Sequence, residues 1–278
     1  MTTDTIITVG KSVIQHGSYN NRIYLMKLYE DDSGSIISTL NMTANENNYS
    51  KIFAKVPAKF KNIFLSDNYV LEASIPNFYE GKEDGLFLSK YYSEHRKNVN
   101  NAEEIKRVLE TALGKSMLQI KSVLSNDFSI RKCTLKDTKQ MAEVYSEVFQ
   151  TYPFPINDAN YIADTIKKNV NYYAVFDGKK IVSLSSFEID DESKNSEMTD
   201  FATIPEYRGN NFSHYLLKYM ENQAKNSGIL VSYTIARALS YSMNITFAKS
   251  GYTYSGTLIN NTNICGSLES MNVWYKPL

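Results

Sequence analysis

The chain has 278 residues, of which 42% are hydrophobic, and its 30 basic residues balance its 30 acidic residues. This composition fits a globular protein long enough for two domains, and it excludes the broad positive field on which nucleic-acid binding depends. No stretch approaches the ~18 consecutive apolar residues of a membrane span, and the N-terminus has no basic leader, so we expect a cytoplasmic protein without a membrane partner.

The first half of the chain predicts a small α/β unit. Strands are expected where apolar residues alternate or cluster, at 22–28, 51–56, 69–76 and 86–92. Helical patterns lie at 36–45, 58–65 and 101–125. The first helix between two strands predicts a βαβ unit, and the turn at 81–85 predicts a hairpin. We place a domain boundary in the last helical segment, which divides the chain into domains 1–125 and 126–278.

The second half predicts the order β-α-α-β-β-β-loop-α-β-α-β-β. Its strands are expected at 128–132, 172–176, 180–189, 197–203 and 229–235, with two closing strands around Gly266. Its helices are expected at 135–149, 158–168, 212–226 and 240–249, and a polar turn at 190–196. We therefore expect an α+β fold with a mixed sheet. The strand, turn and strand after Tyr69 echo those after Tyr252, which indicates either that the N-terminal unit is a partial copy of the C-terminal one or a coincidence.

Residues 199–220 are the most informative stretch, because they indicate a strand, a loop of small polar residues and a helix. The backbone amides from Gly209 to His214 would point at one anion at the helix N-terminus, beside Arg208. This pattern predicts a phosphate site. Cys133, Cys265 and three scattered histidines have no metal-binding spacing, so we expect no metal.

The order of elements after residue 128 resembles that of the GNAT N-acetyltransferases. Their acetyl-CoA loop, Arg/Gln-x-x-Gly-x-Gly/Ala, is similar to the six consecutive residues Arg208, Gly209, Asn210, Asn211, Phe212 and Ser213. The resemblance implies that the amides of this loop bind the pyrophosphate of acetyl-CoA. Asn211 and Ser213 depart from the pattern, but Asn tolerates left-handed backbone and Ser is small, so we expect the loop to form.

The resemblance also implies further contacts to the cofactor. The backbone of Phe201, Ala202 and Thr203 would pair with the pantetheine arm as an added strand does. Asn244 is a candidate contact, with the alternative that it is a helix-surface residue.

Segments along most of the chain resemble the beta-lysine N-acetyltransferases of methanogens and some bacteria. They are SVIQHG at 12–17, NRIYLMK at 21–27, KIFAKVP at 51–57, EASIPNFYEG at 72–81 and ARALSYSMN at 236–244. This resemblance implies acetyl transfer from acetyl-CoA to the terminal amine of beta-lysine, which gives a compatible solute. The alternatives are a GNAT enzyme for another small amine, a polyamine or a protein N-terminus, and a catalytically silent regulator that binds acetyl-CoA. Homodimerisation stays open.

Amine acetylation needs a base for an ammonium whose reference pKa is ~10.4 and a proton for the departing thiolate. The candidate bases are Glu197, where histone-acetylating relatives keep a glutamate, and Asp200. Strand alternation puts these two on opposite faces unless a β-bulge intervenes, and either carboxylate could instead be a solvated strand end. Phe247 stands where the family usually has a proton-donating tyrosine, so Tyr241, Tyr252 or water would replace it, or the thiolate leaves unassisted.

The carboxylate of beta-lysine calls for a guanidinium group. Arg237, which follows the strand at 229–235, is the favoured candidate. We expect Arg22 to make a structural pairing at the surface instead. The N-terminal domain is expected to cover the substrate side of the cleft, because binding sites favour domain interfaces.

Overall fold

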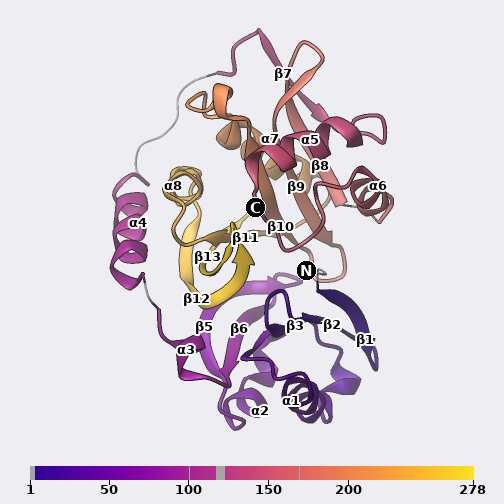
Figure 1. The fold of residues 1–278 in the computed structure, drawn as a ribbon, viewed down its shortest axis with the longest axis vertical. Helices are drawn as coiled ribbons and strands as arrows, with labels where there is room; N and C mark the ends of the chain where they lie inside the picture. The colour runs from indigo at the N-terminus through magenta and orange to yellow at the C-terminus, as the bar shows by residue number, and fades with distance from the viewer. Residues whose placement is uncertain (1–3, 100, 117–122, 169) are drawn as a thin grey trace.

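The computed structural model describes residues 4–99, 101–116, 123–168 and 170–278. It contains two mixed sheets, one in each half of the chain, with the N-terminal sheet below the C-terminal unit in Figure 1. No helix in this described part is long and apolar enough to cross a membrane.

The N-terminal sheet has the strand order β1-β2-β3-β4-β6-β5. Its strands are β1 Thr5–Val9, β2 Ser12–Gly17, β3 Arg22–Lys27, β4 Lys51–Pro57, β5 Val70–Tyr79 and β6 Glu83–Tyr91. Its helices are η1 Glu30–Asp32, α1 Ile36–Glu46, η2 Ala58–Phe60, α2 Lys61–Leu65 and α3 Glu94–Lys97. The parallel pairing of β3 with β4 confirms the predicted βαβ unit, and the antiparallel pairing of β5 with β6 confirms the hairpin.

The two faces of this sheet differ in chemistry because side chains alternate along β3 and β4. Ile23 and Leu25 pack with Ile36 of α1 and Phe64 of α2 in a buried cluster on one face. Arg22 and the other even-numbered positions of β3 lie on the opposite face. The helices therefore cover one face of the sheet and leave a face that carries polar and aromatic side chains.

Strands β1 and β2 and the short helix α3 were missed in the sequence. β1 is an edge strand whose Ile6 and Ile7 are exposed, so it lacks the alternation of a half-buried strand. β2 does not alternate either, because its two apolar residues Val13 and Ile14 are adjacent. Helix α4 Ala102–Gly114 covers the first part of the helix predicted at 101–125, and residues 117–122 lie outside the described residues.

The C-terminal sheet has the strand order β12-β13-β11-β10-β9-β8-β7. Its strands are β7 Phe128–Lys132, β8 Val170–Asp177, β9 Lys180–Asp190, β10 Asn195–Thr203, β11 Val231–Arg237, β12 Thr253–Ile264 and β13 Ser267–Pro277. Its helices are α5 Thr138–Val148, α6 Ala159–Lys167, η3 Pro205–Tyr207, α7 Phe212–Asn226 and α8 Tyr241–Lys249. All the elements predicted for this half are present, although the polar turn at 190–196 is shorter because β9 and β10 extend into it.

The two sheets share one topology. Strands β1-β2-β3-β4-β6-β5 correspond to β8-β9-β10-β11-β13-β12, with a parallel pair in the middle of each sheet. Helices α1 and α7 are the crossovers of these parallel pairs, and α2 and α8 occupy the next connection. The N-terminal unit therefore repeats the C-terminal one without β7, α5 and α6, which confirms the echo seen in the sequence.

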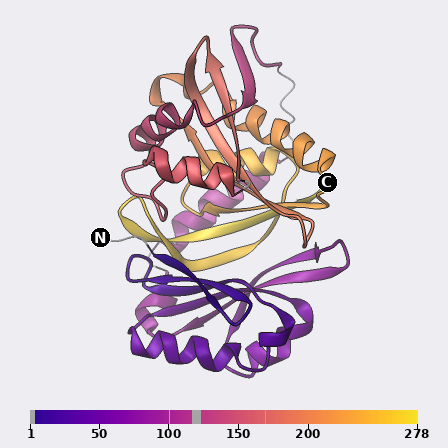
Figure 2. The same cartoon turned by 90° about the vertical axis from the view of Figure 1, so that its right-hand side faces the viewer.

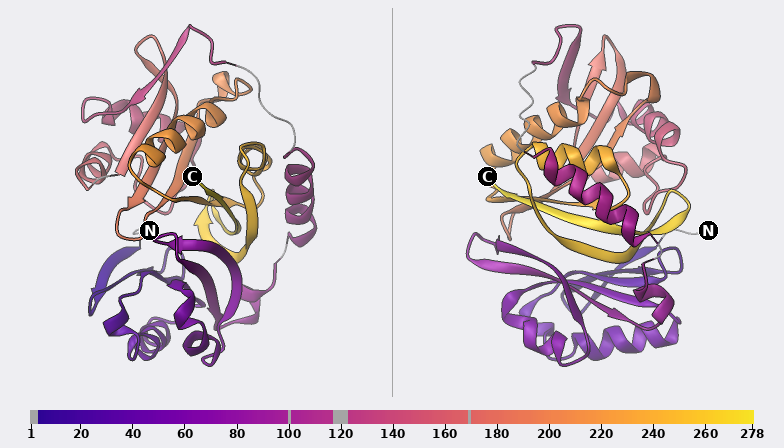
Figure 3. Two further views of the ribbon diagram at one scale, coloured as in Figure 1. Left: turned by 180° about the vertical axis from the view of Figure 1, so that it is seen from behind. Right: turned by 90° about the vertical axis from the view of Figure 1, so that its left-hand side faces the viewer.

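The sheets pack against each other over a shared apolar core. Phe53, Phe78 and Phe87 of the N-terminal sheet join Tyr233 and Val273 of the C-terminal sheet in one buried cluster. Figure 2 shows β12 and β13 lying across the N-terminal sheet, with α1 on the far side. Helix α4 contacts α8, beside which it runs in Figure 3. The polar and aromatic face of the N-terminal sheet thus becomes one wall of the interface.

Candidate active site

Strands β10 and β11 separate partway along their length. They pair as parallel neighbours only at residues 195–197 and 231–233, although both strands continue beyond these positions. A cavity of about 550 Å³ lies beyond the separation, a size typical of small-molecule sites. It is lined by the ends of both strands, the loop between β10 and α7, and helix α8.

The loop forms as the sequence predicted. Gly209 has φ +88°, a backbone conformation that favours glycine, and Asn211 adopts the left-handed conformation with φ 58° and ψ 25°. Helix α7 begins at Phe212, and the residues of its first turn from Phe212 to His214 line the cavity. Arg208 is exposed beside them, with its Nε 3.4 Å from the Thr203 carbonyl. Arg208, Gly209, Asn210, Asn211, Phe212 and Ser213 all line this cavity.

The end of β10 offers backbone groups to the same cavity. Ala202 and Thr203 pair with β9 on one side, and β11 has already separated from them on the other. The side chains of Phe201 and Thr203 line the cavity, whereas Ala202 is buried in the core. Phe201 packs edge-on against Phe247 with 5.7 Å between ring centroids. An extended ligand could therefore pair with this free strand edge.

A β-bulge brings the two candidate bases to one cavity. The register of β10 against β9 shifts between Thr199 and Ala202, and Asp200 has φ +57°. Simple alternation would place Glu197 and Asp200 on opposite faces, but both line a second cavity of about 210 Å³.

The smaller cavity lies at the interface of the two sheets. Arg22, Tyr24 and Lys55 supply its N-terminal wall, and Glu188 and Glu197 supply part of its C-terminal wall. The residues that line both cavities are Tyr152, Thr199, Asp200, Ile235, Ile264 and Met271. The two cavities therefore meet at the bulge, and Asp200 faces both of them whereas Glu197 faces only the smaller.

Asp200 is held in place by three hydroxyl groups. Tyr152 donates to Oδ1, Ser186 donates to Oδ2 at 2.6 Å, and Thr199 donates to Oδ1 at 3.4 Å. Burial raises the pKa of Asp200, and these hydrogen bonds oppose the rise. A carboxylate with a raised pKa at the junction of two cavities is suited to accept a proton.

Glu197 lies at the end of a short chain of hydrogen bonds that begins in the N-terminal sheet. Lys55 Nζ donates to the Tyr233 hydroxyl at 2.9 Å, and that hydroxyl donates to Glu197 Oε2 at 3.0 Å. Burial raises the pKa of Glu197, while Lys55 and the Tyr233 hydrogen bond lower it. Glu188 also lines this cavity. Loss of hydration raises the pKa of its carboxyl group, and the charges of Glu197 and Asp200 raise it further. Carboxylates therefore dominate this side of the cavity.

Two candidates from the sequence lie away from both cavities. Tyr241 is 39% exposed, and its hydroxyl donates to Glu104 of α4 at 2.9 Å. Asn244 is buried and its side chain is fully used inside the protein. Its Nδ2 donates to the Arg237 and Ser240 carbonyls, and its Oδ1 accepts from Asn272 and Trp274. Asn244 is thus neither a cavity residue nor a helix-surface residue.

The two candidate arginines also differ from expectation. Arg237 lines the larger cavity, but its Nε and Nη2 bind Glu269 at 2.9 Å and 2.6 Å. Arg22 was expected at the surface, which is wrong, because it is only 5% exposed and lines the smaller cavity. Arg22 is the first residue of β3, and the polar face of this strand packs against the C-terminal sheet instead of facing solvent.

Phe247 is fully buried and lines the larger cavity, where a phenyl group has no proton to donate. The alternative donor Tyr252 is also buried, and its hydroxyl is 2.6 Å from that of Ser232. Neither Tyr241 nor Tyr252 lines the cavity. Of the donors weighed from the sequence, the geometry leaves only solvent.

Sequence reasoning missed Tyr152, Lys55, Tyr233 and Glu188 as site residues. A signal for Lys55 exists, because Lys51, Phe53 and Lys55 of β4 are polar or aromatic while Ile52, Ala54 and Val56 between them are aliphatic. Tyr152 lies in a loop between two helices and carries no periodic signal. No group of three or more His, Cys, Asp or Glu side chains in the described ranges could hold a metal ion.

Residues 138–246 match the model of the acetyltransferase (GNAT) family. Over 280 aligned residues, the chain is 43% identical to the beta-lysine N(6)-acetyltransferase of Methanococcus maripaludis, and the match covers 98% of both chains. It is 31% identical to the N-acetyltransferase YodP of Bacillus subtilis over 96% of each chain. It is 30% identical to the beta-lysine N(6)-acetyltransferase of Methanosarcina mazei, with 87% of this chain and 97% of that protein covered. The similarity therefore includes the N-terminal sheet.

Proposed function

The chain belongs to the GNAT acetyltransferase family and is an acyltransferase, and from this premise we propose that it moves the acetyl group of acetyl-CoA to the terminal amine of beta-lysine. The product would be N-epsilon-acetyl-beta-lysine. The observation that carries the proposal is the pair of adjoining cavities, one against the anion-binding loop and one between the sheets. Similarity to two beta-lysine N(6)-acetyltransferases over both sheets supports the choice of substrate.

The larger cavity would hold acetyl-CoA. The amides of Gly209 to Ser213 and the positive end of α7 would bind the pyrophosphate, with Arg208 adding charge. The free edge of β10 at Phe201 to Thr203 would pair with the pantetheine arm. When bound, acetyl-CoA supplies a thioester carbonyl that an amine can attack.

The smaller cavity would hold the diamino acid. Its volume of about 210 Å³ suits a small amino acid. The terminal ammonium would lie at the junction, where Asp200 can take its proton directly or through a water. Glu197 and Glu188 would stabilise the positive charge of the substrate before that transfer.

The departing thiol needs no buried donor in this scheme. Phe247 occupies the usual donor position, and the hydroxyls of Tyr241 and Tyr252 are engaged elsewhere. A thiol with a reference pKa of ~8.5 can leave as the thiolate and take a proton from solvent.

We also propose that residues 1–125 close the substrate side of the site, while residues 126–278 bind the cofactor. Arg22, Tyr24, Met26, Phe53 and Lys55 form the N-terminal wall of the smaller cavity together with Gln15. The cavity would be open to solvent without this wall. Because the two sheets share a buried core, the whole chain is the right object for experiments.

The proposal is tested by measuring free-thiol release from acetyl-CoA with beta-lysine, lysine and spermidine. We expect the highest kcat/KM with beta-lysine, by about tenfold or more. A higher kcat/KM with spermidine would favour the polyamine alternative. Stabilisation by acetyl-CoA in a thermal-shift assay without thiol release from any amine would favour a silent regulator.

A further inference from the structure

The wall of the smaller cavity contains buried polar atoms that have no partner. Eight such side-chain atoms occur among the described residues, and three of them belong to residues lining this cavity: Gln15 Nε2, Arg22 Nε and Asn261 Oδ1. A buried donor or acceptor without a partner costs ~1–3 kcal/mol, so a cluster of three requires an explanation.

The two arginines near the site use their guanidinium groups differently. Arg237 binds Glu269 through Nε and Nη2, which form the edge that matches a carboxylate. Arg22 instead donates from Nη1 to the Asn261 carbonyl and, at 3.2 Å, to the Thr262 hydroxyl. Its Nε is unused within the described part of the chain. The hydrogen bonds of Nη1 therefore fix the orientation of the Arg22 side chain. They leave Nε, a donor on the edge that matches a carboxylate, without a partner in the described residues.

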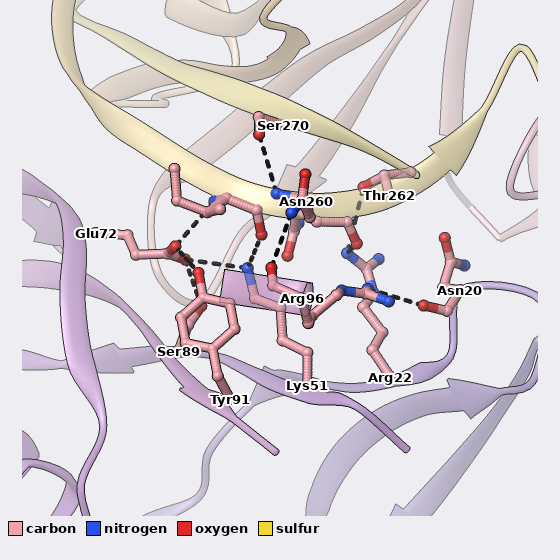
Figure 4. A network of polar contacts seen from close by, with 12 residues as sticks. Asn20, Arg22, Lys51, Glu72, Ser89, Tyr91, Arg96, Asn260, Thr262 and Ser270 are labelled. Carbon is pink, nitrogen blue, oxygen red and sulfur yellow. Dashed lines mark hydrogen bonds and ion pairs between the residues drawn. The ribbon is translucent and has the colours of Figure 1, made fainter. Parts of the chain in front are cut away.

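Arg22 also belongs to a buried network that is rich in positive charge (Figure 4). Lys51 Nζ donates to the Ile259 carbonyl at 2.7 Å and to Glu72 at 3.2 Å, and Arg96 Nη2 donates to the Asn20 carbonyl at 2.9 Å. In the ranges described, Glu72 is the carboxylate that hydrogen-bonds to a cation of this network, and it binds Lys51 rather than Arg22.

The nearby Asp4 does not neutralise Arg22 by contact either. Its carboxylate accepts hydrogen bonds from the amides of Tyr19 and Asn20 and from the Asn20 side chain. The positive charge at Arg22 is therefore paired with carbonyl and hydroxyl oxygens rather than with an anion. A buried guanidinium in this state favours an anionic ligand.

The smaller cavity carries charged groups of both signs. Its lining includes the cationic Arg22 with the polar Gln15 and Asn261, and it also includes the carboxyl groups of Glu188, Glu197 and Asp200. Lys55 also faces the cavity, but its ammonium group is bound to the Tyr233 hydroxyl. A molecule with a carboxylate at one end and an ammonium at the other complements this arrangement, whereas a polyamine does not.

We propose that Gln15 Nε2 and Arg22 Nε donate hydrogen bonds to the carboxylate of the substrate, and that Asn261 Oδ1 accepts one from its second ammonium group. This assignment rests on the proposed function, because it names the parts of beta-lysine that each atom recognises. The backbone carbonyl of Asn261 accepts a hydrogen bond from Arg22, and Gln15, Arg22 and Asn261 all line the same cavity. The carboxylate and the neighbouring amine of a beta-amino acid are likewise close together. These residues select a diamino acid over a diamine.

The test compares beta-lysine with pentane-1,4-diamine, which is beta-lysine with its carboxylate replaced by hydrogen. The measured quantity is the ratio of kcat/KM for the two substrates in the full-length enzyme. Arg22→Met should lower this ratio by about 100-fold, and Gln15→Leu by about tenfold, with the loss in KM for beta-lysine. Arg237→Met, whose fork is occupied by Glu269, is the matched control and should leave the ratio unchanged.

Folding of the Arg22 and Gln15 variants is checked by acetyl-CoA binding, which should stay within about twofold of the wild type because neither residue lines the larger cavity. Gln15→Leu removes an atom with no partner, so it tests the site even if Arg22→Met fails to fold. Beta-lysine turnover with an unchanged ratio in the Arg22 and Gln15 variants, or equal losses with both substrates, overturns the inference and leaves the proposed function standing. A wild type that acetylates the diamine or spermidine but not beta-lysine overturns the proposed function and this inference together.

Discussion

The two sheets have the same strand order, yet their central loops are chemically opposite. In the C-terminal sheet, β10 leads through Arg208 and Gly209 into α7, and β10 separates early from β11. In the N-terminal sheet, β3 leads through Glu30, Asp31 and Asp32 into α1. Three acidic residues in that loop would repel a pyrophosphate, and Asp32 instead accepts hydrogen bonds from the amides of Lys11 and Ser12. Topology alone therefore does not make a cofactor site.

The two sheets also each contain a β-bulge at an equivalent strand, but the residues at the two bulges differ in chemistry. The register between β2 and β3 shifts near Met26, as the register between β9 and β10 shifts near Asp200. Both Met26 and Asp200 line the smaller cavity, but only Asp200 can accept a proton. In the proposed reaction, the C-terminal half thus supplies the reactive groups and the N-terminal half supplies a wall of the substrate cavity.

Asp200→Asn tests whether the C-terminal bulge carries the chemistry. Asn fits the left-handed backbone at this position but cannot take a proton, so kcat with beta-lysine should fall by about 10²- to 10³-fold while acetyl-CoA binding stays the same. Asp190→Asn is the control, because Asp190 lines the same cavity away from the junction. A kcat of the Asp200 variant within about threefold of the wild type would refute its role as a base.

Arg208→Glu gives the C-terminal loop the sign of the N-terminal loop. The affinity for acetyl-CoA should fall by about tenfold at low salt, and by less at high salt, because the side chain is exposed. Calorimetry measures both values. Asp31→Lys makes the reverse change in the other loop and should not alter the affinity. Equal effects of the two substitutions would mean that the loops do not differ in function.

Tyr233→Phe cuts the hydrogen-bond chain that links the two sheets. The Tyr233 hydroxyl lowers the pKa of Glu197, so its removal should raise that pKa further. If Glu197 acts as a carboxylate, kcat/KM is lost as the pH falls through this pKa, and the acid limb of the profile should move to higher pH. The plateau should change by only a few fold. Tyr145→Phe removes a buried hydroxyl that has no partner in the described residues, and its profile should match the wild type.

Tyr241→Phe should have the smallest effect, because the sequence suggested a proton donor and the structure places this hydroxyl on Glu104. We expect kcat to change by less than about twofold and the free energy of unfolding to stay close to that of the wild type, because this hydrogen bond lies at the surface. Thiol release and urea unfolding measure the two quantities. A tenfold loss of kcat would instead support Tyr241 as the proton donor to the thiolate.

Local patterns in the sequence predicted the features that depend on neighbours along the chain. The βαβ unit, the hairpin with its turn at 81–85 and a loop that accommodates Asn211 in the left-handed conformation were predicted correctly. The bulge in β10 was raised as a condition for Glu197 and Asp200 to face one cavity, and the structure contains it.

Partners that are distant in sequence were not predictable. Glu269 occupies the fork of Arg237, and Trp274 and Asn272 occupy the amide of Asn244, from strands that no local pattern connects to them. Arg22 and Lys55 become site residues only because the two sheets meet face to face. A sequence pattern shows which face of a strand is polar, but it does not show what that face meets.

The most direct test of the account is a crystal structure of the full chain with coenzyme A and beta-lysine. We predict that the pyrophosphate binds to the amides of residues 209–213 and that the diamino acid lies in the smaller cavity, with its terminal amine beside Asp200. Coenzyme A bound at the loop between β3 and α1, or beta-lysine bound outside the cavity between the sheets, would contradict it.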